Sequence, residues 1–175
     1  MTAEELVFEG CNFFRQRLTY SLLSGRPIVI HDIRKDDDAP GIKDFEAKFI
    51  SLLERITNGT IVEINTTGTK VHFRPGLIIG GVLTMDCGAE RCLSYYLEPL
   101  IIISPFCKNA MNLKLKGLYT CWLLKPSFNI LYCLTCVTNT PGEISVDAMK
   151  ATWLPVYNKF VLNDEKIQLH VTIFN

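Results

Sequence analysis

Arginine side chains near the ends of predicted helices and strands are the residues best suited to chemistry in this sequence. A guanidinium group offers a planar fork of N–H donors that matches the oxygens of a phosphate. The chain has 18 basic and 18 acidic residues, so it lacks the bulk positive charge of a nonspecific nucleic-acid binder. Any contact with RNA or phosphate must be local, and we predict that it involves Arg15, Arg17, Arg34 and Arg74.

Other residue types with catalytic potential do not form a recognisable site. Cys133 and Cys136 form a C-x-x-C pair, but a closed zinc site needs four ligands and no second pair lies in range. His31 and His72 each fall in an apolar run, which favours packed histidines over catalytic bases. The sequence also lacks a Walker loop, a G-x-G-x-x-G loop and a nucleophile elbow. We therefore predict no catalytic residue, no metal site and no cofactor.

Hydrophobic periodicity in the first half predicts the elements that would position the arginines. They are a helix over 11–23 that ends at Gly25, a strand over 28–33, a helix over 45–56, and short strands over 61–64 and 71–73. Between the first strand and the second helix, the run Asp36–Asp38 before Pro40-Gly41 is typical of a solvated loop.

The second half repeats this order of elements. The prediction is a strand from Gly80, a helix over 91–103, a strand over 111–116, a helix over 144–160 and a last strand over 167–173. Thr140-Pro141-Gly142 before the last helix also matches Ala39-Pro40-Gly41 in the first half. We predict two α/β repeat units, residues 1–79 and 80–175.

The second predicted unit contains an apolar stretch over about 118–136 with no counterpart in the first. We interpret this stretch as an insertion that interrupts the second unit. It approaches the length of a membrane span, but Lys125, Pro126, Ser127 and Asn129 cluster at its middle, where polar groups and helix breaks are most costly. We therefore predict no contact with a membrane.

A series of short motifs runs through the first half and into the start of the second. They are Gly10–Leu18, Leu23–Pro27, Ile33-Arg34 with Pro40-Gly41, Asp44–Ala47, Ile56–Thr60, Glu63–Thr69, and Arg74–Leu77 with Gly80-Gly81. Together they resemble the eukaryotic non-cyclase branch of the RNA 3′-terminal phosphate cyclase family, over Phe8 to about Lys116 and again from Val137 to about Val171. The resemblance implies an α+β fold of repeated units, each with two helices on a four-stranded sheet. This chain is expected to hold the N-terminal part of that fold, truncated after two units.

The resemblance also implies that the cyclase pocket is lost. Cyclases carry a glutamate followed by a run of glycines before their first helix, whereas this chain has Glu9-Gly10-Cys11-Asn12. Arg15 and Arg34 match the family pattern, but a second arginine is replaced by Asp37 and a glutamine by Phe45. A carboxylate in place of a cation repels phosphate. The histidine that true cyclases adenylate lies near their C-terminal end, which this chain is not expected to reach.

The function implied by the resemblance is that of a non-catalytic ribosome biogenesis factor. Such a factor belongs to the small-subunit processome in the nucleolus of the nucleus and acts in early pre-rRNA processing for 40S subunit maturation. The implied partners are a Bms-type GTPase and the pre-ribosomal particle, with a pre-rRNA contact through Arg15 and Arg34. Two alternatives stay open: an RNA-processing enzyme, either a cyclase or an endoribonuclease, and a truncated gene product without independent function.

Overall fold

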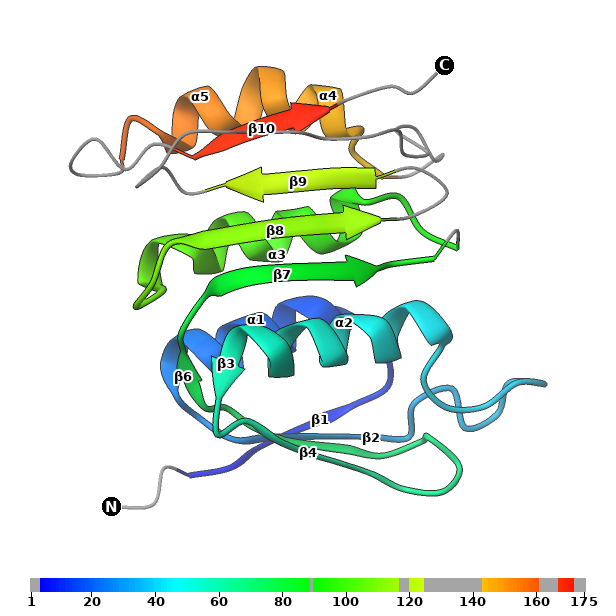
Figure 1. The fold of residues 1–175 in the computed structure, drawn as a ribbon. Coiled ribbons are helices and arrows are strands. Elements are labelled where there is room, and N and C mark those ends of the chain that lie inside the picture. The colour runs from blue at the N-terminus through cyan, green and yellow to red at the C-terminus, as the bar shows by residue number, and fades with distance from the viewer. Residues whose placement is uncertain (1–3, 89, 117–119, 125–142, 161–166, 172–175) are drawn as a thin grey trace. The chain divides into compact units, whose positions relative to one another are not determined.

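The computed structural model describes residues 4–88, 90–116, 120–124, 143–160 and 167–171. The chain divides into two compact units, Met1–Ile78 (unit 1) and Ile79–Asn175 (unit 2). In the described residues each unit combines helices with a four-stranded sheet, so the fold is mixed α and β (Figure 1).

Unit 1 contains the helices and strands that the first half of the sequence predicts, together with an additional first strand. Its elements are β1 (Leu6–Glu9), α1 (Phe14–Ser24), β2 (Ile28–His31), α2 (Asp44–Ile56), β4 (Ile61–Ile64) and β5 (Val71–Arg74), with a small pair formed by β3 (Thr57–Asn58) and β6 (Leu77–Ile78). α1 ends at Gly25, whose φ of 67° is a left-handed conformation that glycine adopts without strain. The strand β1 was not predicted, because no turn signal precedes its short apolar run, whereas β4 and β5 flank a clear turn at Asn65–Gly68.

The sheet of unit 1 has the order β1-β2-β5-β4. β1 and β2 are parallel, with Leu6 opposite Ile28 and Phe8 opposite Ile30, and α1 makes the crossover between them. β2, β5 and β4 pair antiparallel. The parallel pair matters for function because it places the carboxyl ends of β1 and β2 at the same edge of the sheet.

The core of unit 1 lies between its sheet and its two helices, which cover one face of that sheet (Figure 1). The buried apolar residues of the helices are Phe14, Leu18 and Leu22 from α1 and Phe45, Phe49, Ile50, Leu52, Leu53 and Ile56 from α2. They share this core with Ile28, Ile30, Val71 and Phe73 of the central strands. Alternation along the strands therefore fixes which side chains face the helices.

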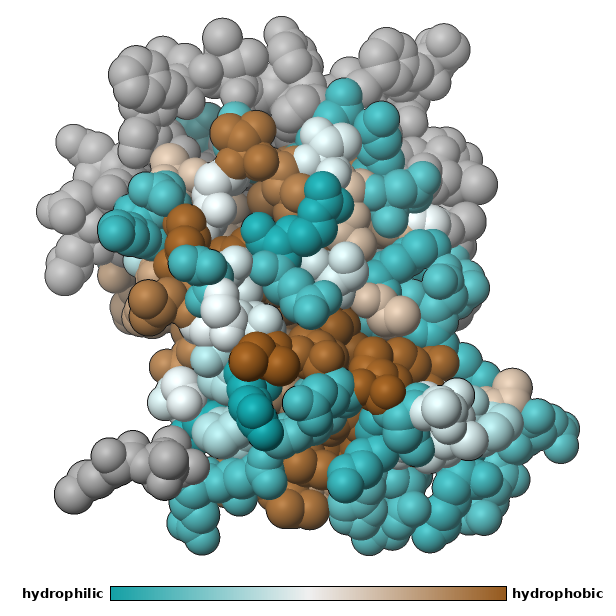
Figure 2. Space-filling model, turned by 60° about the horizontal axis from the view of Figure 1, so that its bottom comes forward, coloured by the Kyte–Doolittle hydropathy of each residue, from teal (hydrophilic) through white to brown (hydrophobic). Residues whose placement is uncertain are grey.

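The opposite face of this sheet is more polar than the predicted apolar strands suggest. His31 and His72 lie half-buried on this face. The prediction favoured packed histidines, but neither side chain lies in the core. The Nδ1 atom of His31 lies 3.0 Å from Asp32, and His72 is paired with Glu5 and Glu63. On this side of unit 1, hydrophilic residues surround smaller hydrophobic areas (Figure 2).

Unit 2 begins, like unit 1, with two parallel strands joined by a helix. Its elements are β7 (Gly81–Asp86), α3 (Ser94–Ile103), η1 (Ser104–Phe106), β8 (Met111–Lys116), β9 (Thr120–Leu124), α4 (Val146–Ala148), η2 (Met149–Trp153), α5 (Leu154–Tyr157) and β10 (Gln168–Val171). The predicted helix over 144–160 is thus a helical segment with a π turn at its centre, where the N–H of Leu154 bonds to the carbonyl of Met149. Pro155 follows this turn and has no N–H to donate to an α-helical ladder.

The sheet of unit 2 has the order β7-β8-β9-β10, in which β7 and β8 are parallel and the other pairs antiparallel. Residues 120–124 of the predicted insertion form β9, between β8 and β10, whereas 125–136 and the Cys133–Cys136 pair lie outside the described residues. The repeat of units and the insertion stay predictions. No helix in the described ranges has both the length and the apolar character that crossing a membrane requires.

The core of unit 1 gives a direct test of this fold. Phe49 is fully buried on α2, so Phe49→Ala leaves a large cavity and is expected to lower the free energy of unfolding by about 3–5 kcal/mol. Phe106, whose exposed fraction is 64%, is the control, and Phe106→Ala is expected to cost less than about 1 kcal/mol. Urea unfolding followed by circular dichroism measures both, and equal losses would contradict the packing described for α2.

Candidate functional site

Two loops follow the carboxyl ends of the parallel strands β1 and β2. Residues 10–13 connect β1 to α1 (the β1–α1 loop), and residues 32–43 connect β2 to α2 (the β2–α2 loop). The carboxyl ends of parallel strands are a common place for ligands in α/β proteins, because loops and helix N-termini converge there. These loops contain or adjoin three of the four predicted phosphate-binding arginines, Arg15, Arg17 and Arg34.

Both loops contain backbone conformations that side chains rarely adopt. Phe13, Asp32 and Arg34 have φ angles of 55°, 54° and 48°, and in the described chain they are the non-glycine residues with positive φ. Such conformations cost energy and persist only where the surrounding structure fixes them. Ile33 supplies that constraint in the second loop, since its side chain is fully buried and its N–H donates to the carbonyl of Thr69 at 3.0 Å.

The β2–α2 loop is also held by a close backbone contact. Gly41 lies against Thr67 and Gly68 in the turn between β4 and β5, and a Cβ atom on Gly41 would lie 2.4 Å from the Thr67 carbonyl oxygen. Only glycine fits this contact, and its φ of 88° is also one that favours glycine. The loop that carries Arg34 is therefore rigidly placed.

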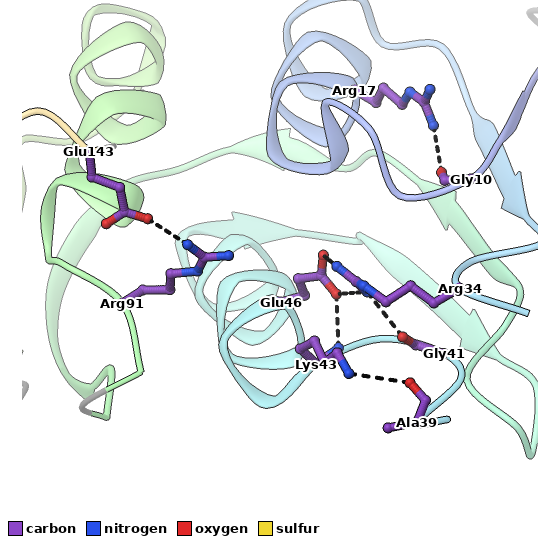
Figure 3. Close-up of polar contacts among 9 residues, drawn as sticks. All are labelled: Gly10, Arg17, Arg34, Ala39, Gly41, Lys43, Glu46, Arg91 and Glu143. Atoms are coloured by element: carbon purple, nitrogen blue, oxygen red, sulfur yellow. Dashed lines mark hydrogen bonds and ion pairs between the residues drawn. The ribbon is translucent and has the colours of Figure 1, made fainter. Parts of the chain in front are cut away.

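Arg34 forms a two-pronged ion pair with Glu46 in the first turn of α2 (Figure 3). Its Nη1 and Nη2 atoms donate to the two carboxylate oxygens at 2.7 Å each, and Nη1 also donates to the carbonyl of Gly41 at 3.0 Å. The side chains are only 14% and 3% exposed, and the hydrogen bonds that Arg34 donates to Glu46 raise the pKa of Arg34 above its usual value. The guanidinium fork thus already holds a carboxylate.

Glu46 satisfies a backbone group in addition to Arg34. Its Oε2 atom accepts the N–H of Lys43 at 2.8 Å, directly before α2 begins. This contact caps the helix, because the first N–H groups of a helix have no partner within it. One buried carboxylate therefore fixes both the arginine and the start of α2.

Arg17 braces the first loop through its guanidinium group. Its Nη1 atom donates to the carbonyl of Gly10 at 2.8 Å (Figure 3). The same atom donates to the carbonyl of Glu9 at 3.2 Å, and the guanidinium lies 4.9 Å from the centre of the Phe8 ring. Burial lowers the pKa of Arg17, because the charged form loses water. The side chain ties α1 to the end of β1.

The other two predicted arginines lie at different ends of unit 1. Arg15 is half-buried in the first turn of α1, next to the β1–α1 loop. Arg74 is exposed at the end of β5, opposite Ile61. Since β5 runs antiparallel to β2, Arg74 lies at the far edge of the sheet from Arg34. The structure places Arg15, Arg17 and Arg34 at the same edge of the sheet and Arg74 at the other edge, and their role in binding phosphate stays a prediction.

The N-terminus of α1 is the most favourable feature for an anion. No side chain caps it and its first turn has no acidic residue, so the backbone N–H groups and the helix dipole attract negative charge there. The second loop acts against this attraction. Lys35 forms an ion pair with Asp32 at 3.4 Å. Asp32 also accepts a hydrogen bond from the neighbouring His31, and this bond lowers the pKa of Asp32. Asp36–Asp38 are exposed on the same loop.

The positions where the sequence departs from cyclases have clear structural roles. Phe45 is buried on α2, where it adds to the core and offers no polar group. Asp37 lies close enough to Arg34 to help raise the pKa of that arginine. Cys11, Asn12 and Phe13 carry side chains at the points where glycines would let an anion approach the backbone. The arrangement suits a weak anion contact at α1 better than a nucleotide pocket.

Sequence comparison decides the family of this fold. The model of the family described as RNA 3′-terminal phosphate cyclase matches residues 6–173. The chain belongs to this family. A protein of Caenorhabditis elegans named "Probable RNA 3'-terminal phosphate cyclase-like protein" is 61% identical over 98% of the chain. The human RNA 3'-terminal phosphate cyclase-like protein is 43% identical over 97% of the chain.

A more distant relative in the family has a name that refers to rRNA processing. The protein of Saccharomyces cerevisiae named "rRNA processing protein RCL1" is 35% identical over 87% of the chain. The chain covers 40% of the length of the nematode and human proteins and 36% of the yeast protein. It therefore spans well under half the length of these relatives.

The role of Glu46 was missed by the sequence analysis, which assigned Arg34 to phosphate. Glu46→Gln leaves the guanidinium of Arg34 buried without a counter-charge, so we expect the free energy of unfolding to fall by about 3 kcal/mol. Asp44→Asn on the same helix breaks the exposed pair with Lys48 and is expected to cost less than about 1 kcal/mol. Urea unfolding measures both variants.

A double substitution separates the contribution of the ion pair to the free energy of unfolding from that of the helix cap. Arg34→Gln with Glu46→Gln is expected to cost clearly less than the two single losses added together, because neither charge is then left unpaired. Strict additivity would show that the two side chains do not interact as described.

Proposed function

We propose that this chain acts as a non-catalytic part of an rRNA-processing factor. The observation that carries the proposal is the Arg34–Glu46 pair. In this member of the family, the arginine that was predicted to bind phosphate binds a buried carboxylate and stabilises the fold. The relatives named rRNA processing proteins support RNA processing as the setting. The finer proposal is the small-subunit processome of the nucleolus, in early pre-rRNA processing for the 40S subunit.

The electrostatics of unit 1 support binding rather than catalysis. A cyclase must hold both a nucleotide and an RNA phosphate, so it needs several cations free to face the ligands. Here Arg34 and Lys35 are paired with Glu46 and Asp32. The exposed carboxylates of Asp36–Asp38 would also repel a polyphosphate.

The proposal includes partners and a fold of repeated units. A Bms-type GTPase and the pre-ribosomal particle are the proposed partners, and Arg15 beside the N-terminus of α1 is the proposed contact for a pre-rRNA phosphate. The parallel β-α-β start of both units supports two copies of one α/β unit. Protein surfaces carry most of the interaction in this proposal, since the chain has no net charge.

Cosedimentation tests the proposed setting. A tagged copy expressed in Caenorhabditis elegans is expected to sediment with pre-ribosomal particles and to concentrate in the nucleolus. Arg15→Glu is expected to reduce crosslinking to pre-rRNA several-fold, whereas Arg55→Glu, an exposed arginine at the end of α2, is expected to leave it unchanged. A wild-type chain that is found only outside the nucleolus and only in the light fractions would overturn the proposal.

An enzymatic role is the rival function, and a cyclase assay separates it from the proposal. The purified chain is incubated with ATP and an oligonucleotide that ends in a 3′-phosphate. We expect no cyclic phosphate product and no adenylated protein, because Arg34 and Lys35 of the β2–α2 loop are paired with carboxylates. Formation of either product would show that the chain is a nucleotidyl-transfer enzyme.

A further inference from the structure

An open groove of about 800 Å³ lies in unit 1, away from the β1–α1 and β2–α2 loops for most of its length. Leu6 and Phe8 of β1 form its floor, and one side of α1 forms its wall. Its lining is mostly apolar, and polar atoms supply only a small part of it. β1 is the edge strand of the sheet, so no further strand or helix of unit 1 covers this side in the described residues.

The wall of the groove is a regular stripe along α1. Arg17, Tyr20 and Ser24 follow one another at intervals of three or four residues, which is the spacing of one helix face, and Phe13 lines the groove directly before the helix begins. Phe13 and Tyr20 are 74% and 61% exposed, although both are large aromatic residues. From Arg17 to Ser24 the stripe is about 10 Å long at 1.5 Å per residue, which matches two turns of a second helix.

The charge around the groove has one sign. Arg17 and Arg26 both line it, and the polar partners of Arg17 are uncharged carbonyl oxygens. Arg26 has one loose ion pair at 3.7 Å with Glu4, whose side chain is almost fully exposed. α1 itself contains two arginines and no acidic residue. An occupant that carries carboxylates would therefore gain favourable contacts at Arg17 and Arg26.

We infer that this groove binds an amphipathic helix of a partner protein, with carboxylates placed beside its apolar stripe. A second copy of this chain is a poorer occupant, because packing α1 against α1 brings arginines together. An extended strand added to β1 is also poorer, since the carbonyl of Glu9 at that edge is already bonded to Arg17. The groove fits a helix that supplies both apolar side chains and negative charge.

A designed peptide pair tests this inference with the purified chain. The probe is a fluorescein-labelled helical 16-residue peptide with leucines on one face and glutamates beside them, and its match has lysine for each glutamate. Fluorescence anisotropy is expected to show at least tenfold tighter binding of the glutamate peptide. The chain has no net charge, so this preference must come from local groups.

Two substitutions locate the binding site. Arg26→Glu is expected to weaken the glutamate peptide about tenfold and to strengthen the lysine peptide, while the matched control Arg55→Glu on α2 changes neither. Tyr20→Ala is expected to weaken the glutamate peptide about tenfold. Val7→Ala, an exposed residue on the opposite face of β1, is the control for lost apolar surface. Urea unfolding midpoints confirm that each variant is folded.

Three outcomes would overturn the inference. Equal binding of the two peptides would remove the charge argument, and binding that is insensitive to Tyr20→Ala would place the peptide elsewhere. A dimer seen by sedimentation equilibrium and dissociated by Tyr20→Ala would show that a second copy fills the groove. None of these measurements involves ribosomal particles, so the inference can fail while the proposed function holds, and the reverse is also true.

Discussion

The ion pair between Arg34 and Glu46 is the constraint on which the arrangement of unit 1 depends. It joins the loop after β2 to the first turn of α2, across 12 positions of sequence. Both charges are largely removed from water, and a buried pair is tolerated only when its hydrogen bonds are nearly all satisfied. The carbonyl of Gly41 and the N–H of Lys43 complete that set, so the loop, the turn at Gly41 and the start of α2 hold one another in place.

The same pair explains how a family residue can be present without its expected chemistry. An arginine fork that donates two short hydrogen bonds to a buried carboxylate has few donors left for a phosphate. Releasing it would leave Glu46 charged and unpaired inside unit 1, which costs far more than an exposed phosphate contact returns. The positive charge of Arg34 therefore stabilises the fold instead of binding a ligand. The feature that can still attract an anion is the uncapped N-terminus of α1.

Local patterns in the sequence predicted most elements but not the contacts that join them. α1, β2 and α2 were predicted because apolar residues recur at helical spacing or form β-branched runs, and because Gly25 stops the first helix. β1 was missed because its short apolar run has no turn signal before it, and its pairing with β2 does not show in sequence spacing. The role of Glu46 was missed for a similar reason, since its place on α2 resembles that of any solvated helix carboxylate. Arg74 was grouped with Arg34, but the reversal of direction at β5 separates them.

Unit 2 shows that a carboxylate shared between an arginine and a backbone N–H is not peculiar to α2. Glu143 accepts a hydrogen bond from Arg91 at 3.1 Å (Figure 3). It also accepts one from the N–H of Cys92 at 3.1 Å, just before α3 begins. The residues are about fifty positions apart, so this contact ties the segment before α4 to the start of α3 and closes a long loop of chain. Arg91 is much more exposed than Arg34, and water screens its charge, so the pair stabilises unit 2 less than Arg34–Glu46 stabilises unit 1. Both units thus use an arginine–glutamate pair that also binds a backbone N–H. The two pairs differ in how much they stabilise the fold because they differ in burial, not in residue type.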